Sequence, residues 1–154
     1  MQKVITELET IHQHRRKFEA MMETTLISFQ YKMYELTQLI KKWLRDKEIC
    51  VFTTEINLNI NLPFTRAYPL LSIGFEYKGV FVRIIPKYIL VAGGAKGVAY
   101  LTYDGLSQDG YSIFMEVPQR EHEGWIISRS DKTSSDGFIL TSEVFMSALA
   151  KTLQ

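Results

Sequence analysis

Residues 3–47 read KVITELETIHQHRRKFEAMMETTLISFQYKMYELTQLIKKWLRDK and contain neither glycine nor proline. When successive residues are placed about 100° apart, the apolar side chains form one stripe that only Arg15 interrupts. The members of this stripe are Val4, Leu8, Ile11, Phe18, Met22, Leu26, Phe29, Met33, Leu36, Ile40 and Leu44. Their mean spacing of about 3.6 residues is the period of a straight amphipathic helix. The sequence therefore predicts one long helix over residues 3–47.

A helical hairpin is the alternative interpretation of the same residues. In that alternative, a turn near Thr24 and Thr25 divides the stripe between two shorter helices. No glycine, proline or asparagine marks such a turn, so the continuous helix is favoured.

A helix of this length is longer than any strand that it can cover. Forty-five residues extend for about 67 Å, whereas a strand over residues 51–61 extends for about 36 Å. The apolar stripe must therefore continue past the sheet, and the same helix of a second subunit is the expected cover. Ile27, Tyr31 and Tyr34 form a second apolar patch, about 140° from the stripe, and are candidate interface residues. We expect a homodimer or a higher homo-oligomer.

Alternating apolar and polar residues follow the helix and predict strands. The first run extends from Phe52 to Leu62. Further strands are expected at residues 71–77, 80–85, 88–92, 98–103, 111–117 and 125–129. Lys78 and Gly79 form a two-residue connection typical of a tight hairpin, and Asp104-Gly105 marks another turn. Connections this short force antiparallel neighbours, because a parallel crossover needs a dozen or more residues.

The chain closes on a short helix that we expect over residues 141–153. Thr141 is the candidate N-cap, and Phe145, Leu149 and Leu153 form the apolar face. A long helix, six or seven antiparallel strands within residues 50–130 and a final helix make an α+β fold. We expect one domain over residues 1–154.

The composition is that of an ordinary globular chain. The 154 residues include 18 basic and 17 acidic side chains, so no global field attracts nucleic acid, anionic lipid or acidic substrates. The single cysteine, Cys50, cannot form an internal disulfide, and no apolar run is long enough to span a membrane. We expect a cytoplasmic protein without a cofactor.

The densest glycine cluster is GGAKG, residues 93–97. Together with the strand residues before it, this segment resembles the glycine loop of short-chain dehydrogenases, and the resemblance implies dinucleotide binding. Such a loop should open a helix, whereas residues 98–103 have the pattern of a strand. No Tyr-x-x-x-Lys pair of that family follows either. A hairpin turn is the favoured interpretation.

A phosphate-binding turn is the alternative interpretation of this cluster. In that case backbone amides surround the anion and nearby basic side chains neutralise it. The candidate ligand-binding residues are Arg83, Lys87, Gly93, Gly94, Lys96 and Gly97.

The three histidines form no recognisable catalytic or metal-binding motif. On a helix, His12 and His14 point about 200° apart and cannot share one metal ion. His122 lies in a polar turn and would act as a general base only if Ser128 or Ser130 folded against it. The sequence therefore assigns no catalytic residue and no metal ligand.

Two further polar features have ordinary explanations. Basic residues cluster at 14–17 and 41–47, but glutamates intervene and the clusters do not align, which argues against nucleic-acid binding. Asn57, Asn59 and Asn61 would lie on the polar side of the first strand, facing solvent or a partner.

These observations favour a non-enzymatic intracellular interaction module. It would self-associate through the long helix and bind another macromolecule, such as a protein partner. The alternative is a protein that binds or senses a small anionic ligand, such as a nucleotide, at the Gly93–Gly97 turn. An enzyme acting through His122 ranks third.

Overall fold

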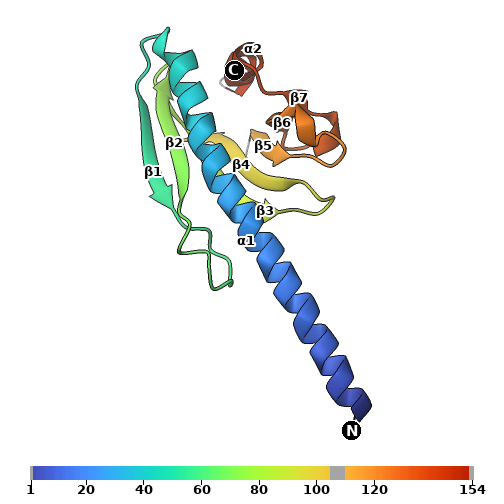
Figure 1. The fold of residues 1–154 in the computed structure, drawn as a ribbon. Coiled ribbons are helices and arrows are strands. Elements are labelled where there is room, and N and C mark those ends of the chain that lie inside the picture. Colours follow the sequence, from blue (N-terminus) through green and yellow to red (C-terminus); the bar gives the residue numbers. More distant parts are fainter. Residues whose placement is uncertain (1, 105–109, 153–154) are drawn as a thin grey trace.

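The computed structural model describes residues 2–104 and 110–152. It begins with the long helix α1 (Gln2–Arg45) and ends with the short helix α2 (Ser142–Thr152). Between them, the described residues form an antiparallel sheet of seven strands. The strands are β1 (Val51–Ile56), β2 (Leu70–Tyr77), β3 (Val80–Leu90), β4 (Lys96–Tyr103), β5 (Tyr111–Glu116), β6 (Ile126–Arg129) and β7 (Phe138–Ile139). Short 3-10 helices, η1 (Glu121–Glu123) and η2 (Ser134–Asp136), precede and follow β6. Figure 1 shows α1 crossing one face of the curved sheet, which confirms the predicted α+β fold.

The long helix is continuous, as predicted, and passes through Thr24 and Thr25 without a turn. Thr25 is buried, and its hydroxyl donates a hydrogen bond to the carbonyl oxygen of Met21 at 2.8 Å. This bond satisfies the polar atom inside the helix. The helix ends at Arg45, and Glu48 beyond it has a left-handed φ of 58°. The two-helix alternative is therefore wrong.

Each strand pairs with its neighbours in the chain, so the sheet is a meander in the order β1 to β7. Tyr77 pairs with Val80 across Lys78 and Gly79. The two turn residues have φ values of 52° and 81°, as a two-residue hairpin turn with two left-handed positions requires. The hairpin predicted from Lys78-Gly79 is confirmed.

The first strand is shorter than predicted. β1 ends at Ile56, which pairs with Leu70 of β2, whereas the alternation in the sequence predicts a strand as far as Leu62. After Ile56 the side chain of Leu58 enters the core. The backbone carbonyl oxygen of Leu58 accepts a hydrogen bond from the amide of Ile60 at 2.9 Å. Such a tight turn removes the chain from the ladder.

The three asparagines that the sequence assigns to this strand lie in a loop instead. Asn57, Asn59 and Asn61 belong to the connection 57–69, and all three are exposed. The prediction of a polar strand face at these positions is wrong, because the alternation continues past the end of the hydrogen-bonded ladder.

β3 is one strand of eleven residues, where the sequence predicts two strands at residues 80–85 and 88–92. Pro86 pairs with Ala99, and Tyr88 pairs with Val98, so the register shifts between them. This bulge interrupts the ladder beside a residue that has no amide hydrogen to donate. The proline is therefore accommodated without ending the strand.

β7 lies beyond the predicted limit of the sheet. Its two residues pair with Ile126 and Ile127 of β6. A strand of two residues contains no measurable period, so the sequence pattern does not reveal it. The predicted turn residue Gly105 and the last apolar position of the predicted final helix, Leu153, lie outside the described residues.

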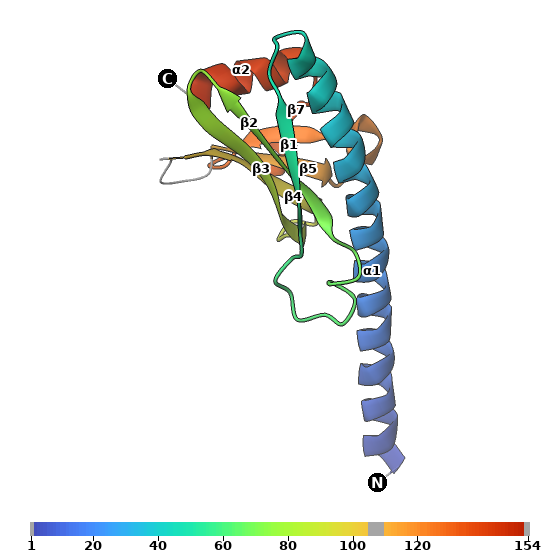
Figure 2. The same ribbon diagram turned by 90° about the vertical axis from the view of Figure 1, so that its left-hand side faces the viewer.

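α2 begins where the sequence predicts. The hydroxyl of Thr141 accepts a hydrogen bond from the amide of Val144 at 3.2 Å, as an N-cap does. Phe145 of α2 packs between Trp43 and Phe75, with ring centroids 5.6 Å and 6.1 Å away. α2 therefore closes one end of the core, beside the C-terminal end of α1 (Figure 2).

The main core lies where the C-terminal half of α1 and α2 cover the sheet. Its largest fully buried side chains include Phe29, Phe75, Phe145, Leu26, Met33 and Leu36. β4 comes close to α1 at Gly97, where an added Cβ atom would lie 3.0 Å from Cδ1 of Phe29. A second, smaller apolar cluster contains Ala95, Val98, Phe114, Val117 and Ile126.

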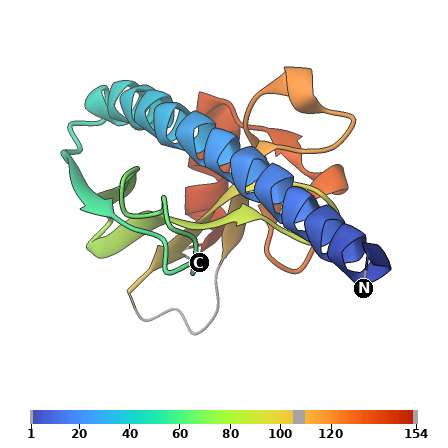
Figure 3. The same ribbon diagram turned by 60° about the horizontal axis from the view of Figure 1, so that its bottom comes forward.

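The N-terminal half of α1 extends beyond the sheet, as the length comparison predicts. Every residue from Gln2 to Phe18 is exposed, and the buried residues of the helix begin at Met22. Figures 1 and 2 show this part of α1 projecting away from the sheet and α2, and in Figure 3 the N-terminal end of α1 is turned toward the viewer.

Candidate functional site

We call residues 2–20 of α1 the projecting segment. Its apolar stripe residues are exposed by 48–63%, and we call them the projecting stripe: Val4, Leu8, Ile11 and Phe18. The same stripe continues along α1 through Leu26, Phe29 and Met33, which are at most 1% exposed. One continuous apolar face is therefore buried against the sheet over half of its length and open over the other half.

The projecting segment is a weak helix when considered by itself. Five of its residues are β-branched, namely Val4, Ile5, Thr6, Thr10 and Ile11, and such residues have low helix propensity. Its first turn contains no acidic residue that would complement the helix dipole. Within residues 2–20, one ion pair supports it, between Arg15 and Glu19 at 3.5 Å. Isolated helices of this length are marginal in water, so the segment depends on its continuity with the buried half of α1 and would gain stability from further contacts.

The predicted second patch is also exposed. Ile27, Tyr31 and Tyr34 are 43%, 62% and 55% exposed. They lie about 140° from the buried stripe on the same helix, and so on the side of α1 that the sheet does not cover.

The glycine cluster forms the turn between β3 and β4. The amide of Val91 donates to the carbonyl oxygen of Ala95 at 3.0 Å, and the amide of Gly94 donates to that of Val91 at 3.0 Å. Gly93 and Gly94 have φ values of 93° and 91°, which other residues rarely adopt. A strand follows the turn, and no helix N-terminus is present there to hold a phosphate.

The candidate basic residues do not converge on this turn. Arg83 pairs with Thr102 on β4, six residues from Lys96, which corresponds to about 20 Å along the strand. Its guanidinium lies 3.7 Å from a carboxylate oxygen of Asp104. Lys87 is exposed near the bulge of β3.

Lys96 itself has acidic neighbours. It pairs with Glu116 of β5. Backbone hydrogen bonds from the amides of Glu121 and Gln119 lower the pKa of the Glu121 carboxyl, and the charge of Lys96 lowers it further to a smaller extent. Gly97 is buried under Phe29. The geometry therefore brings carboxylates, and not a cluster of bases, to the glycine turn.

The histidine candidate for general base chemistry has no serine against it. His122 is exposed on η1. The hydroxyl of Ser128 donates to the carbonyl oxygen of Thr133 at 3.2 Å. Within residues 2–104 and 110–152, no hydrogen bond joins His122 to Ser128 or to the exposed Ser130. The arrangement contains no nucleophile and base pair at this position.

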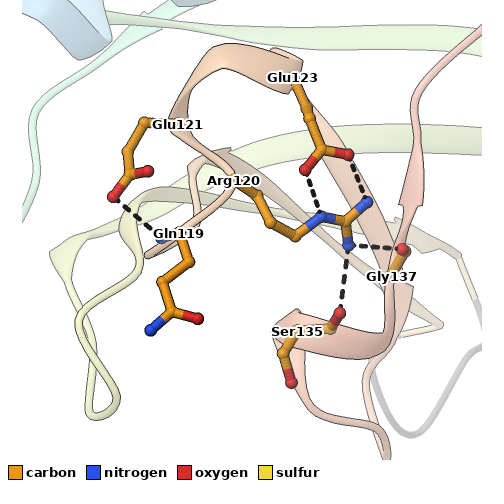
Figure 4. Close-up of polar contacts among 6 residues, drawn as sticks. All are labelled: Gln119, Arg120, Glu121, Glu123, Ser135 and Gly137. Carbon is orange, nitrogen blue, oxygen red and sulfur yellow. Dashed lines mark hydrogen bonds and ion pairs between the residues drawn. The ribbon is translucent and has the colours of Figure 1, made fainter.

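The neighbouring arginine connects the two turns that flank β6 (Figure 4). Nε and Nη2 of Arg120 donate to the two carboxylate oxygens of Glu123, each at 2.9 Å. Nη1 donates to the carbonyl oxygens of Ser135 and Gly137 at 3.2 Å and 2.8 Å. The Arg120 hydrogen bonds lower the pKa of Glu123 below its ordinary value. This network holds η1 against η2 and has the character of a structural clamp.

The clamp predicts a pH-dependent contribution to stability. Because the pKa of Glu123 is lowered in the folded chain, its carboxylate stabilises the fold above the ordinary glutamate pKa of about 4.3. This contribution is lost as the pH falls through the lowered pKa. Glu123→Gln should therefore melt below the parent at pH 7, and the difference should shrink as both are acidified below about pH 4.3.

Melting curves at several pH values measure this difference. Glu55→Gln serves as the control, because Glu55 is exposed on the edge strand β1. It should melt like the parent at pH 7. A Glu123→Gln difference that stays constant down to about pH 2 would show that the charge of Glu123 is not what the clamp uses.

A hollow of about 640 Å³ lies between α2 and the sheet strands β5 to β7. This volume is typical of small-molecule sites. Its apolar lining comes from Tyr111, Ile127, Phe138, Val144 and Ala148. Its charged lining comes from Arg129, Lys132, Lys151, Asp136 and Glu143. We call this hollow the α2 groove, and no pattern of the sequence predicts it.

Several charged groups of the α2 groove are already engaged. Nε of Arg129 lies 3.4 Å from Asp131, and Asp136 accepts a hydrogen bond from the Thr133 hydroxyl at 2.8 Å. Lys132 and Lys151 form no ion pair with any described residue.

Within residues 2–104 and 110–152, no three histidine, cysteine, aspartate or glutamate side chains are grouped so as to hold a metal ion. None of the helices in these ranges combines the length and apolar character needed to cross a bilayer. No protein-family model matches the chain, and neither a curated protein nor a solved structure shows significant similarity to it.

Proposed function

We propose that the protein is a non-enzymatic interaction module that self-associates through the projecting segment and can bind another macromolecule. The observation that supports this proposal is the division of the α1 stripe, which is buried from Met22 onward and open before it. A second copy of the same segment offers a matching apolar surface, as symmetric interfaces do.

The size of the apolar surface indicates how tight the association is. Two copies of the projecting stripe contribute eight half-exposed apolar side chains, each worth on the order of 1 kcal/mol on full burial. The sum, about 8 kcal/mol, exceeds the lowest cost of associating two chains, about 4 kcal/mol, by only about 4 kcal/mol. We therefore expect a weak reversible dimer with a dissociation constant of about 0.1 to 1 mM.

Sedimentation equilibrium over a wide concentration range tests the proposal. Between about 1 µM and about 500 µM the mean mass should rise from the chain mass of 17.9 kDa towards twice that value. A mass of 17.9 kDa at the highest concentration would contradict self-association.

The patch of Ile27, Tyr31 and Tyr34 provides a second contact surface on the opposite side of α1. If the assembly grows beyond a dimer, Tyr31→Glu combined with Tyr34→Glu should return it to a dimer, since both rings supply apolar area. If the parent stops at a dimer, the patch remains available for another macromolecule, and this variant should leave the dimer mass unchanged.

A second candidate function is binding of a small apolar anion, and the α2 groove is the observation that favours it. Lys132 and Lys151 line a hollow that also contains Ile127, Phe138 and Val144. An apolar lining with ammonium groups that form no ion pair with described residues suits a ligand with a hydrocarbon body and a carboxylate or sulfonate head.

Fluorescence of the dye anilinonaphthalene sulfonate, an apolar anion, tests this second function. Lys132→Ala with Lys151→Ala should weaken its binding about tenfold, which corresponds to about 1.4 kcal/mol. Binding of the neutral dye N-phenylnaphthylamine should not change. The matched control, Lys87→Ala with Lys96→Ala, removes the same number of charges from β3 and β4. If the control loses binding instead, the anion binds on β3 and β4 and not in the α2 groove.

A further inference from the structure

The projecting segment has the residue spacing of a coiled coil. Stripe positions 4, 8, 11, 15, 18 and 22 are separated by alternating steps of four and three residues, a pattern that repeats every seven residues. Two steps of four then follow each other, from Phe18 to Met22 and from Met22 to Leu26. This interruption coincides with the point where the sheet begins to bury the stripe. The same alternation resumes over the buried positions 22, 26, 29, 33, 36 and 40, so Met22 divides α1 into a projecting seven-residue repeat and a buried one.

The position of the sheet restricts how a second helix can pack there. α1 is continuous, so the projecting stripe faces the same side as Leu26 and Phe29, which are buried in the core. The stripe is buried from Met22 onward. A parallel partner helix on this side would therefore continue into the volume that the sheet fills along the C-terminal half of α1 (Figure 2). An antiparallel partner ends at that point, and its own sheet lies at the far end of the pair.

We propose that two copies pair their projecting segments antiparallel, with Val4 of each subunit facing Met22 of the partner subunit. In the same register Leu8 faces the partner's Phe18, and Ile11 faces the partner's Arg15. The overlap from residue 4 to residue 22 is about 27 Å long. This arrangement rests on the proposed self-association and specifies its geometry.

Arg15 favours the antiparallel orientation. In a parallel pair in register, identical stripe positions face each other, so the two Arg15 guanidinium groups would meet and repel. In the antiparallel pair the aliphatic part of Arg15 packs on the partner's Ile11. Its Nε can remain beside Glu19 of its own chain, 3.5 Å away.

Ile5 has a role in the antiparallel pair alone. It is 45% exposed and lies about 100° from the centre of the stripe. In the proposed register it flanks the partner's Glu19. That glutamate lines a hollow of about 410 Å³ whose other wall includes Pro63 and Phe64 of the loop 57–69. Ile5 of one subunit therefore reaches the hollow of the other.

Disulfide trapping distinguishes the two orientations. In a Cys50→Ser background, Leu8→Cys and Phe18→Cys chains are oxidised separately and as a mixture, and intact masses identify the products. In the antiparallel pair residues 8 and 18 face each other, whereas two copies of residue 18 are offset by ten residues, about 15 Å. A disulfide needs Cα atoms within about 7 Å. The mixture should therefore yield the mixed disulfide at least about tenfold over either homodisulfide.

A distance measurement that leaves the stripe unchanged provides a second test. A spin label on Thr6→Cys, also in the Cys50→Ser background, lies on the side of α1 opposite the stripe. Antiparallel pairing offsets the two labels by 14 residues, about 21 Å along the axis, and parallel pairing offsets them by none. Efficient linkage of Phe18→Cys to itself, or labels without this offset, would overturn the orientation. A monomeric parent protein would instead overturn the proposed self-association.

Discussion

Glutamate in place of both Leu8 and Phe18 is expected to convert the assembly into monomers of 17.9 kDa at every concentration at which the parent associates. The two side chains are 60% and 48% exposed in the single chain, and neither belongs to its core. In the proposed dimer position 8 faces position 18 of the partner, so four carboxylates would lose water and oppose each other in pairs without a matching positive charge. The cost is several kcal/mol, and the dissociation constant should rise at least about 100-fold.

The control places the same charges on the other side of the same helix. Thr6→Glu with Gln13→Glu alters positions about 180° from the stripe and should leave the mass of the assembly unchanged. Melting of the sheet and α2 should be similar in both variants, because the projecting segment is exposed. Equal loss of association in both variants would attribute the effect to net charge and not to the stripe.

Alanine in place of Gly97 is expected to lower the free energy of unfolding more than alanine in place of Gly79. Gly97 has a φ of 66°, and a Cβ atom there would lie 2.7 Å from Cβ of Met115 and 3.0 Å from Cδ1 of Phe29. The left-handed backbone costs a non-glycine residue about 1 to 3 kcal/mol, and overpacking costs about as much again. We expect a loss of about 3 kcal/mol or more and a melting temperature about 10 °C lower.

Gly79→Ala serves as a control that separates the cost of backbone strain from the cost of overpacking. The φ of Gly79, 81°, is also left-handed, but nothing lies within 4 Å of an added Cβ atom. Gly79→Ala should therefore cost only the backbone strain, about 1 kcal/mol. Denaturant titration of both variants measures the difference, and equal losses would show that α1 and β5 yield to the extra methyl group at Gly97.

The period of the apolar residues predicts the helix and most strands, because each period reflects a repeating backbone geometry. Met22, Leu26 and Phe29 occupy one helical face in the sequence, and all three are buried. Lys78-Gly79 predicts its hairpin for an equally local reason, since few residues other than glycine tolerate the second turn position.

The errors arise where a local pattern and the hydrogen-bonded ladder end at different residues. Alternation continues to Leu62, but β1 loses its partner at Ile56 because β2 begins only at Leu70. Pro86 indicates a break, yet the bulge against Ala99 absorbs it. Both outcomes depend on the neighbouring strand, which a period along one strand does not describe.

The candidate sites show the same division between sequence and tertiary structure. The sequence predicts that Arg83 and Lys96 could bind one anion together, because both lie close to the glycine cluster in the chain. The antiparallel register places Arg83 beside Thr102, at the other end of β4 from Lys96. Tyr111 of β5 and Lys151 of α2 line the same groove because α2 packs across the sheet. No spacing in the sequence predicts that two such distant residues share a site.

The amino-acid pattern is enough to predict α1 as one amphipathic helix longer than its sheet, because helix period and rise per residue are fixed by local backbone geometry. Which half of the stripe is covered follows from the packing of the whole chain, since it depends on where the sheet lies along the helix. The same packing leaves the residues before Met22 open, and so places the candidate interface at the N-terminal end of α1.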